Sequence, residues 1–294
     1  MVGSLKDKSV VLSMKLCNGT TISVIGAGRI GSAIISSLRN HCGDSIKIIA
    51  TGRREETLER AAKLGALAIR DNKQAVGEAD MIVLSVKPHH FPDVVKQTGR
   101  DVWRGKLVVS VMAGVKVKTL ANAMPGADVY RAMTNINVLV GKASTAVANP
   151  ENDSPSKLIV EELFRCMGEV YWVPEEYLDV WTSLAGSGPA FIAEIVDALV
   201  LGATASGMPR DLAYKATLDV LEGTAILLRN ANKHPATIRD EVITPAGTTI
   251  RGIIVMESEG IKSALMKTIE ATYKRFIEIG IEIDQYVKKE LDIS

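Results

Sequence analysis

The feature that most constrains the fold is a glycine-rich turn between an apolar strand and a helix. Thr21–Ile25 is β-branched and apolar, and Ser32–Asn40 after the turn has helical character. The turn itself consists of Gly26, Ala27, Gly28, Arg29, Ile30 and Gly31. In a GxGxxG turn the glycines permit a sharp bend, a close approach of the backbone to a pyrophosphate, and tight packing of the helix on the strand. The flanking strand and helix favour a dinucleotide-binding unit over an ordinary glycine turn.

Further short apolar runs alternate with polar or helical segments along the first half of the chain. Strands are expected at Ile46–Ala50, Ala66–Ile69, Met81–Val86 and Leu107–Val111, with a helix at Glu55–Leu64. Such alternation predicts a parallel sheet with helices on both faces. Two edge strands are predicted at Ala127–Met133 and Ser144–Ala148, and Gly168–Val173 closes this half before Pro174.

After Pro174 the strand-like runs disappear, and alanine, leucine and other small residues dominate. Helices are expected at Pro189–Ser206, Asp211–Ala231, Ile250–Ser258 and Ile261–Leu291. Phe191–Gly207 is apolar on nearly every face, which is typical of a helix buried in a large core or an interface. The predicted fold class is therefore an α/β N-terminal Rossmann-like dinucleotide-binding domain followed by an all-α C-terminal dimerisation domain.

The length of 294 residues suggests about two domains. We expect an N-terminal extension at 1–20, an NADP-binding Rossmann domain at 21–174 and a helical dimerisation and substrate domain at 175–294. The 35 basic and 34 acidic residues nearly cancel, so no nucleic-acid partner is expected. No uncharged apolar run of about 18 residues occurs, so no membrane-spanning helix is expected. The first 20 residues lack the pattern of a secretory signal, which predicts a cytoplasmic protein.

The chain has three cysteines, Cys17, Cys42 and Cys166, which are odd in number and widely spaced. This pattern predicts reduced thiols packed as small apolar groups rather than a disulfide framework or a zinc site. The four histidines show no metal-ligand spacing, so no metal is expected.

The residues after the second predicted strand indicate which dinucleotide binds. NAD sites usually carry an Asp or Glu about 20 residues after the glycine turn, to bind the ribose hydroxyls. Here Thr51 and Gly52 lead instead to Arg53 and Arg54. Two guanidinium groups can bind a 2′-phosphate in a fork, and the alternative is a pair of solvated surface arginines. NADPH is therefore expected in preference to NADH.

Residues at the carboxyl ends of the later strands are candidates for lining the cofactor, because ligands of open α/β sheets bind at that edge. These candidates are Ser85, Val86, Lys87, Pro88, Ala113, Gly114 and Asn135. For Lys87 the alternative is a solvated lysine that precedes a helix-starting proline.

A loop rich in hydroxyl groups, Thr244–Thr249, precedes a predicted helix that starts near Ile250. Backbone N–H groups at such a helix start suit a small carboxylate. The alternative is that Thr248 or Thr249 serves only as the helix cap.

From about Thr21 to the last long helix, the chain resembles the pyrroline-5-carboxylate reductase family. The most specific likeness is His234–Glu257, which looks like the family's HP signature followed by a TPGGTT-like loop. Gly186–Ala190 resembles an SGSGPA-type segment, and Val86–Pro88 and Met112–Gly114 resemble segments that line the cofactor. The chain departs from the family pattern at Thr134, Phe191, Ile243 and Ala246.

The resemblance implies transfer of a hydride from NADPH to C5 of Δ1-pyrroline-5-carboxylate, giving L-proline. It implies that the substrate carboxylate binds the N–H groups of Gly247, Thr248 and Thr249, with the Thr244 hydroxyl nearby. Thr249 and Thr244 are the expected catalytic residues, and the Thr249 hydroxyl is expected to hydrogen-bond the ring nitrogen. The loop is expected to come from the partner subunit of a homodimer, and the resemblance leaves open a further assembly into five dimers.

Three other functions are alternatives to this hypothesis. A hydroxyacid dehydrogenase of the same plan needs a lysine early in the second domain, and no lysine occurs between Val173 and Lys215. A reductase for another small cyclic imine remains an alternative, although the carboxylate-suited loop argues for a substrate with a carboxylate. A non-catalytic NADP-binding sensor also remains, because a fold does not dictate a function.

Overall fold

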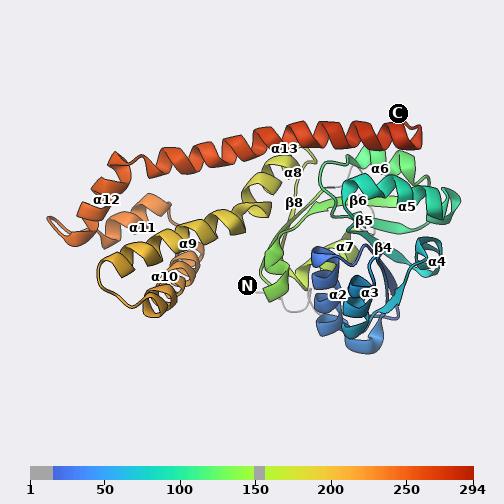
Figure 1. Ribbon diagram of the computed structural model, residues 1–294, viewed down its shortest axis with the longest axis horizontal. Helices are drawn as coiled ribbons and strands as arrows, with labels where there is room; N and C mark the ends of the chain where they lie inside the picture. Colours follow the sequence, from blue (N-terminus) through green and yellow to red (C-terminus); the bar gives the residue numbers. More distant parts are fainter. Residues whose placement is uncertain (1–15, 149–155) are drawn as a thin grey trace, which may run out of the picture. The chain divides into compact units, whose positions relative to one another are not determined.

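The computed structural model describes residues 16–148 and 156–294, and these divide into two compact units. The first unit comprises the described chain up to Ser187 together with Tyr273–Ser294, and the second comprises Gly188–Thr272 (Figure 1). The domain limits expected at residues 20 and 174 stay a prediction, and most of the expected extension lies outside the described residues.

The first unit is built on a sheet whose strands lie in the order β3-β2-β1-β4-β5-β6-β7-β8. All neighbouring strands pair in parallel except β6 and β7. Their bounds are β1 Thr21–Ile25, β2 Lys47–Thr51, β3 Leu67–Ile69, β4 Met81–Leu84, β5 Leu107–Ser110, β6 Asp128–Met133, β7 Ala143–Ala148 and β8 Gly168–Trp172. This arrangement confirms the predicted Rossmann-like sheet.

The prediction of two edge strands is wrong. The segments in question are β6 and β7, which lie inside the sheet, whereas the edges are β3 and β8. β7 reverses direction beside β6 and then gives β8 a parallel neighbour. Most β7 residues are buried, as expected for a strand covered on both faces.

Helices cover both faces of this sheet (Figure 1). One apolar cluster joins the strands to α2 (Arg29–Cys42), α3 (Glu55–Lys63) and α7 (Lys157–Arg165). The other joins them to α4 (Asn72–Glu78), α5 (Phe91–Thr98), α6 (Val117–Ala123) and Val287 near the end of α13 (Ile261–Leu291). A helix α8 (Tyr177–Trp181) and a π-helical turn (Thr182–Gly186) end the first continuous part of the unit.

The second unit is helical, as predicted. It contains α9 (Gly188–Ala205), α10 (Arg210–Ala231), α11 (Pro235–Val242), α12 (Thr248–Ser258) and the first part of α13. The short helix α11 is not among the helices that the sequence predicts. Its start is capped by His234, whose Nδ1 accepts from the Ala236 N–H at 3.2 Å, and Pro235 occupies the first helical position.

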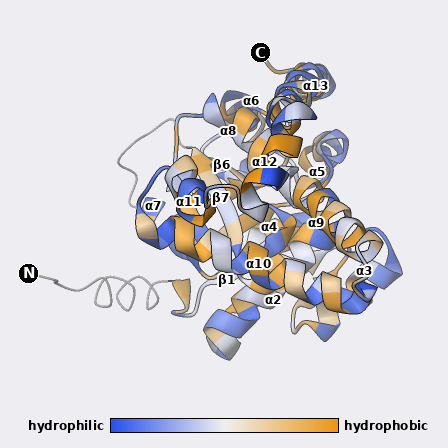
Figure 2. Ribbon diagram, turned by 90° about the vertical axis from the view of Figure 1, so that its left-hand side faces the viewer, coloured by the Kyte–Doolittle hydropathy of each residue, from blue (hydrophilic) through white to orange (hydrophobic). Residues whose placement is uncertain are grey.

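The second unit leaves many large apolar side chains exposed. Figure 2 shows apolar residues along α9, α10 and α12, and α9 and α10 line a groove of about 500 Å³. By length and composition alone, the helical stretch Tyr177–Ala205 is apolar enough to cross a membrane, although little of it is buried. Glu194 and Asp197 interrupt it, which is why the sequence predicted no spanning helix. An exposed apolar surface of this extent is typical of a protein interface.

The expectation of three reduced cysteines is wrong for two of them. Cys17 and Cys42 form a disulfide, with their Cα atoms 5.1 Å apart. The residues just before β1 run beside the C-terminal end of α2, since the Gly19 N–H donates to the Ser45 carbonyl at 2.9 Å. That contact depends on tertiary structure, so cysteine spacing did not reveal it. Cys166 is a free thiol.

Candidate active site

The glycine turn forms a bend that only glycine accommodates at two positions. Gly26 has φ +96°, and a Cβ there would lie 2.6 Å from Val86 Cγ1. A Cβ on Gly31 would lie 2.4 Å from the Gly26 carbonyl oxygen. Gly28 is different, because a Cβ there would meet nothing within 4 Å. The first and third glycines thus serve the close packing of strand and helix, and the second leaves open space for a ligand.

This turn lies at the topological switch point of the sheet, where successive strands are added first on one side of β1 and then on the other. β1 pairs with β2 on one side and with β4 on the other, and ligands of open α/β sheets bind at that crevice. The Ser85 hydroxyl, just beyond β4, donates to the Gly26 carbonyl at 2.6 Å. The N-cap of α2, Gly28, offers no side-chain cap, so the first N–H groups of α2 are available to an anion.

A cavity of about 590 Å³ opens over this turn, a size suited to a cofactor. It brings together many of the predicted site residues. Those that line it are Gly26, Ala27, Gly28, Arg29, Arg53, Arg54, Ser85, Val86 and Lys87.

Basic side chains gather at the rim of this cavity beyond β2. Arg53, Arg54, Arg60 and Arg70 all line it. Arg70 Nη1 donates to the Arg53 carbonyl at 2.7 Å, and Arg60 Nη2 donates to the Ala27 carbonyl at 3.2 Å. Several cationic groups at one rim suit a phosphate, which accepts forked hydrogen bonds from guanidinium groups.

A histidine holds the side chain of Arg53. Arg53 Nη2 lies 2.6 Å from His90 Nε2, and because arginine has no acceptor, Nε2 must be the acceptor. Burial, together with the adjacent His89 and the Arg53 guanidinium, lowers the pKa of His90 below its ordinary value. The neutral imidazole can therefore orient Arg53 without adding a competing charge.

Sequence reasoning missed Arg60, Arg70 and His90. Arg70 directly follows β3, so the rule that ligands lie beyond the carboxyl ends of parallel strands was sufficient to identify it. His90 lies in the short helix Pro88–His90 that follows Lys87. Arg60 lies within α3, and only the folded structure brings it to the cavity.

Other predicted residues lie outside the cavity lining, and their cofactor roles stay predictions. Ile30 packs on the apolar core, and Pro88 starts the short helix after β4. Ala113 packs beside Leu178 in a small apolar cluster. Gly114 has φ +80°, and a Cβ there would lie 3.0 Å from Gly280 Cα, so this glycine allows α13 to approach closely.

Asn135 is buried and already makes two hydrogen bonds. Its Nδ2 donates to the Ala185 carbonyl at 3.0 Å, and its Oδ1 accepts from the Asn137 N–H at 3.2 Å. These contacts fasten the end of β6 to the π-helical turn before Ser187. They give Asn135 a structural role, and a role toward the nicotinamide stays a prediction.

In the second unit, the loop before α12 has the geometry expected for an anion site. The Gly247 N–H donates to the Thr244 carbonyl at 3.0 Å, and a Cβ on Gly247 would lie 2.2 Å from Thr244 Oγ1. Gly247 is the N-cap of α12 and has no side chain to cap it. Thr248 and Thr249 therefore open the helix with N–H groups that lack a side-chain cap, and Thr244 is exposed beside them.

The departure from the family pattern at Ala246 has a visible consequence. Ala246 has φ +58°, the left-handed region that favours glycine. The loop thus keeps the backbone that a glycine accommodates more easily, despite the alanine.

The fold and these two sites define a class: a two-unit oxidoreductase with a dinucleotide cleft and a separate helical unit. The model for the NADP oxidoreductase, coenzyme F420-dependent, family matches residues 21–114. The model for pyrroline-5-carboxylate reductase dimerisation matches residues 175–279, which includes α9 to α12.

Curated relatives extend the likeness over nearly the whole chain. A pyrroline-5-carboxylate reductase from Methanosarcina acetivorans is 35% identical over 88% of this chain and 97% of its own length. One from Synechocystis is 33% identical over 88% of this chain and 98% of its own length. The chain belongs to the pyrroline-5-carboxylate reductase family, as its resemblance predicted.

Solved structures agree with this assignment. A pyrroline-5-carboxylate reductase from Coxiella burnetii superposes with a TM-score of 0.80 at 29% identity, covering 89% of this chain and 98% of its own. The Plasmodium falciparum pyrroline carboxylate reductase, solved with NADP bound, gives a TM-score of 0.79 at 22% identity over 89% and 98%. At that identity the second likeness shows the fold alone, and it is the predicted fold. The dimerisation model also indicates that the second unit self-associates.

Proposed function

We propose that this protein reduces L-Δ1-pyrroline-5-carboxylate to L-proline with NADPH. The observation that carries the proposal is that one chain of this family holds both an arginine-rimmed dinucleotide cleft and an uncapped, hydroxyl-rich helix start. The first suits a phosphorylated dinucleotide, and the second suits a small carboxylate.

The residues of the cleft fit NADPH. The pyrophosphate binds in the open space at Gly28, next to the N–H groups at the start of α2. A side chain on residue 28 would project into this space. Arg53 and Arg54 bind the 2′-phosphate, with Arg70 and His90 holding Arg53 in place. Lys87 and Val86 line the same cavity farther along the β4 edge. When bound, NADPH supplies the hydride.

The loop before α12 binds the substrate's carboxylate. The N–H groups of Thr248 and Thr249 face the anion, and the Thr244 hydroxyl adds a donor. The expected role of the Gly247 N–H as a third donor needs a change of the loop, because this N–H donates to the Thr244 carbonyl at 3.0 Å. The Thr249 hydroxyl hydrogen-bonds the ring nitrogen, so that C5 points at the cofactor. These assignments rest on the family likeness of the loop and on its uncapped helix start.

The chemistry needs positioning more than acid–base catalysis. A cyclic imine is most electrophilic when protonated, and an iminium that binds already protonated requires no strong acid from the protein. The residues around the loop then act by holding the ring in a near-attack geometry. This is consistent with the absence of a lysine between Val173 and Lys215.

The active unit is a dimer in which the loop of one chain faces the cofactor cleft of its partner. The exposed apolar surface of α9 and α10 supports this, because such a surface is typical of an interface. A pentamer of dimers is the larger assembly that we propose from the family. The proposed location is the cytoplasm, with no nucleic-acid or membrane partner.

The test is a spectrophotometric assay with purified protein, NADPH and pyrroline-5-carboxylate, compared with 1-pyrroline, which lacks the carboxylate. We expect oxidation of NADPH with the carboxylate substrate and at least tenfold lower kcat/KM without the carboxylate, since charge-assisted hydrogen bonds contribute about 1.5–3 kcal/mol. Equal kcat/KM for both imines would favour a broader imine reductase. No oxidation with either imine would favour a non-catalytic sensor.

A further inference from the structure

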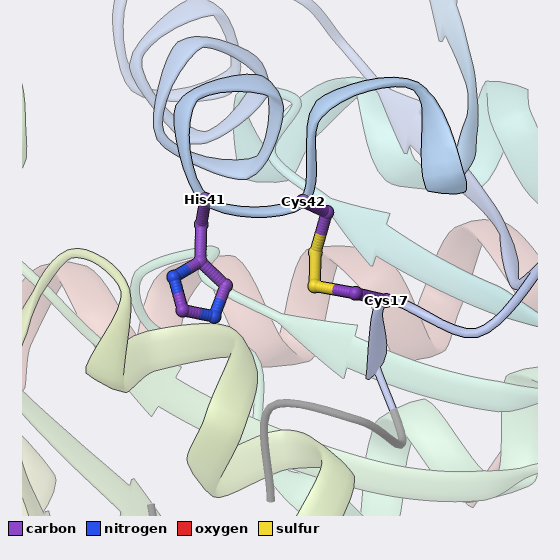
Figure 3. A group of neighbouring side chains, drawn as sticks. All are labelled: Cys17, His41 and Cys42. Carbon is purple, nitrogen blue, oxygen red and sulfur yellow. A yellow bond between two sulfur atoms is a disulfide. The ribbon is translucent and has the colours of Figure 1, made fainter. Parts of the chain in front are cut away.

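A cysteine pair lies outside the cofactor cleft and has no part in the proposed reaction. Figure 3 shows His41 and Cys42 at the end of α2, with Cys42 bonded to Cys17 from the segment before β1. Cys42 is buried and only 7% exposed, whereas Cys17 is partly exposed. Cys17 is therefore the more exposed residue of the pair, and Cys42 is the more shielded one.

The bond closes a loop around the whole phosphate-binding unit. The two cysteines are 25 residues apart, and β1, the glycine turn and α2 all lie between them. The adjoining residue, Leu16, is fully buried, and its N–H donates to Glu162 Oε2 at 2.8 Å. The bond thus fastens the residues just before β1 to the C-terminal end of α2, the helix whose N-terminus lies at the proposed pyrophosphate site.

The remaining cysteine provides an internal contrast. Burial, reinforced by the charge of Glu162, raises the pKa of the Cys166 thiol to about 12. Its Sγ also donates to the Leu163 carbonyl at 3.0 Å. Because the thiolate is the reactive form, Cys166 is poorly suited to exchange with disulfides.

We propose that Cys17 and Cys42 form a reversible thiol–disulfide site. A small disulfide such as oxidised glutathione oxidises the pair, and the resulting bond fastens residues 16–20 to the end of α2. The proposed location, the cytoplasm, is a reducing compartment that keeps most thiols reduced. In that compartment a bond between a partly exposed and a buried cysteine is reversible rather than permanent. The site concerns the stability of the cofactor unit and is independent of the proposed substrate.

The proposed exchange begins at Cys17, because this residue is more exposed than Cys42. The Cys17 thiolate attacks one sulfur of the small disulfide, whose S–S bond breaks and releases one thiol, which takes up the proton lost by Cys17. The Cys42 thiolate then attacks the Cys17 sulfur of the mixed disulfide and releases the second thiol, which takes up the other proton. The protein loses two electrons and the small disulfide gains them.

A metal site is the competing use of the same side chains. Ligand atoms of Cys17, His41 and Cys42 lie within 4.8 Å of one another, which is close enough for one soft ion. The bonded sulfurs favour the disulfide, since one sulfur pair cannot hold a metal ion and a disulfide at once. Zinc binding is therefore an outcome that the experiment must detect.

The experiment equilibrates the full-length protein in mixtures of reduced and oxidised glutathione and counts thiols by intact mass after alkylation. We expect a single reversible transition involving two thiols, unchanged in Cys166→Ser and abolished in Cys17→Ser and Cys42→Ser. Cys42→Ser should trap a glutathione adduct on Cys17, whereas Cys17→Ser should leave Cys42 largely unmodified. Retention of the disulfide in excess reduced glutathione, or no oxidation in excess oxidised glutathione, would overturn the proposal.

Thermal unfolding separates the effect of the bond from a merely local oxidation. A loop of this length predicts that oxidation raises Tm by on the order of 5–10 °C, because the bond restricts the unfolded chain. Cys17→Ser should show no such difference between oxidised and reduced samples, while Cys166→Ser should show the full difference. If ZnCl2 binds the reduced protein at one ion per chain and prevents oxidation, the site is a metal site and the proposal is wrong.

Discussion

At the scale of single residues, the cofactor cleft depends on side chains that their neighbours hold in place. Arg53 is held at its side chain by His90 and at its carbonyl by Arg70. A group that is fixed before the ligand arrives loses less conformational freedom on binding. Replacing Arg53 should therefore weaken the preference for a 2′-phosphate more than replacing an arginine whose side chain no neighbour holds.

Replacing Arg53 with alanine should raise KM for NADPH by tenfold or more and leave KM for NADH nearly unchanged. Charge-assisted hydrogen bonds contribute about 1.5–3 kcal/mol, which corresponds to that change. Arg54→Ala should act in the same direction, and Arg165→Ala, whose salt bridge to Glu161 lies on α7, is the matched control. Steady-state kinetics with both cofactors decide the matter. An equal loss with NADPH and NADH would place the arginines at the pyrophosphate instead.

Ala246 offers a second test at this scale. Because its φ of +58° penalises an alanine, Ala246→Gly should stabilise the protein by about 1 kcal/mol and raise Tm by a few degrees. Ala225→Gly, in the interior of α10, should cost about 1 kcal/mol and serves as control. Differential scanning calorimetry measures both. A lower Tm for Ala246→Gly would mean that the left-handed backbone is not populated in solution.

At the scale of elements, a buried carboxylate fastens the last turns of α13 to the start of α6, within the first unit. Asp284 accepts from the Lys116 N–H at 3.0 Å and pairs with Lys288 at 3.1 Å. Burial opposes its ionisation, but the hydrogen bond from the Lys116 N–H and the contact with the Lys288 ammonium group outweigh it, so the pKa of Asp284 lies below its ordinary value. A lowered carboxyl pKa stabilises the folded state above the unfolded pKa, and that stability is lost as pH falls through the folded pKa.

Asp284→Asn should therefore lower the unfolding free energy at pH 7 and matter progressively less below about pH 4, the ordinary range of an aspartate. Glu278→Gln, whose exposed partner is Arg275, should have little effect at any pH. Denaturant unfolding between pH 3 and 7 provides the measurement. A difference between wild type and Asp284→Asn that grows on acidification would contradict the assigned sign.

The sequence predicted those elements that follow local patterns, and failed where long-range contacts decide. The strands from β1 to β5 follow from short apolar runs, and the glycine turn follows from its spacing. β6 lies inside the sheet because β7 pairs with it, and β7 lies inside because β8, which follows α7 in the chain, pairs with β7. Arg131, in the middle of β6, is fully buried because Glu175 and Asp179 reach it from more than 40 residues away.

The candidate site shows the same division. Arg53, Ser85 and Lys87 were identified because each follows a strand, and the cavity contains all three. Arg60 and His90 reach that cavity from within or beyond helices, where no local pattern marks them. The Cys17–Cys42 bond is the clearest failure, since nothing in the spacing of two cysteines shows that the residues just before β1 lie beside the end of α2.

At the scale of the whole molecule, the proposed active site needs two chains. Subunit complementation tests this directly. The double variant Arg53→Ala/Arg54→Ala and the variant Thr249→Val should each be weakly active at limiting NADPH. After subunit exchange, mixed dimers regain one intact site, so activity should rise to about one quarter of wild type for random pairing. No gain on mixing, with exchange verified by mass spectrometry, would show that each site is built from one chain.

The central claim is that a hydride passes from NADPH to C5 of pyrroline-5-carboxylate, and the most direct measurement follows that hydrogen. The protein is incubated with pyrroline-5-carboxylate and NADPH carrying deuterium at the transferred C4 position, and the product is analysed by NMR and chiral chromatography. We expect L-proline with one deuterium at C5. Unlabelled proline, or oxidation of the cofactor without any proline, would contradict it.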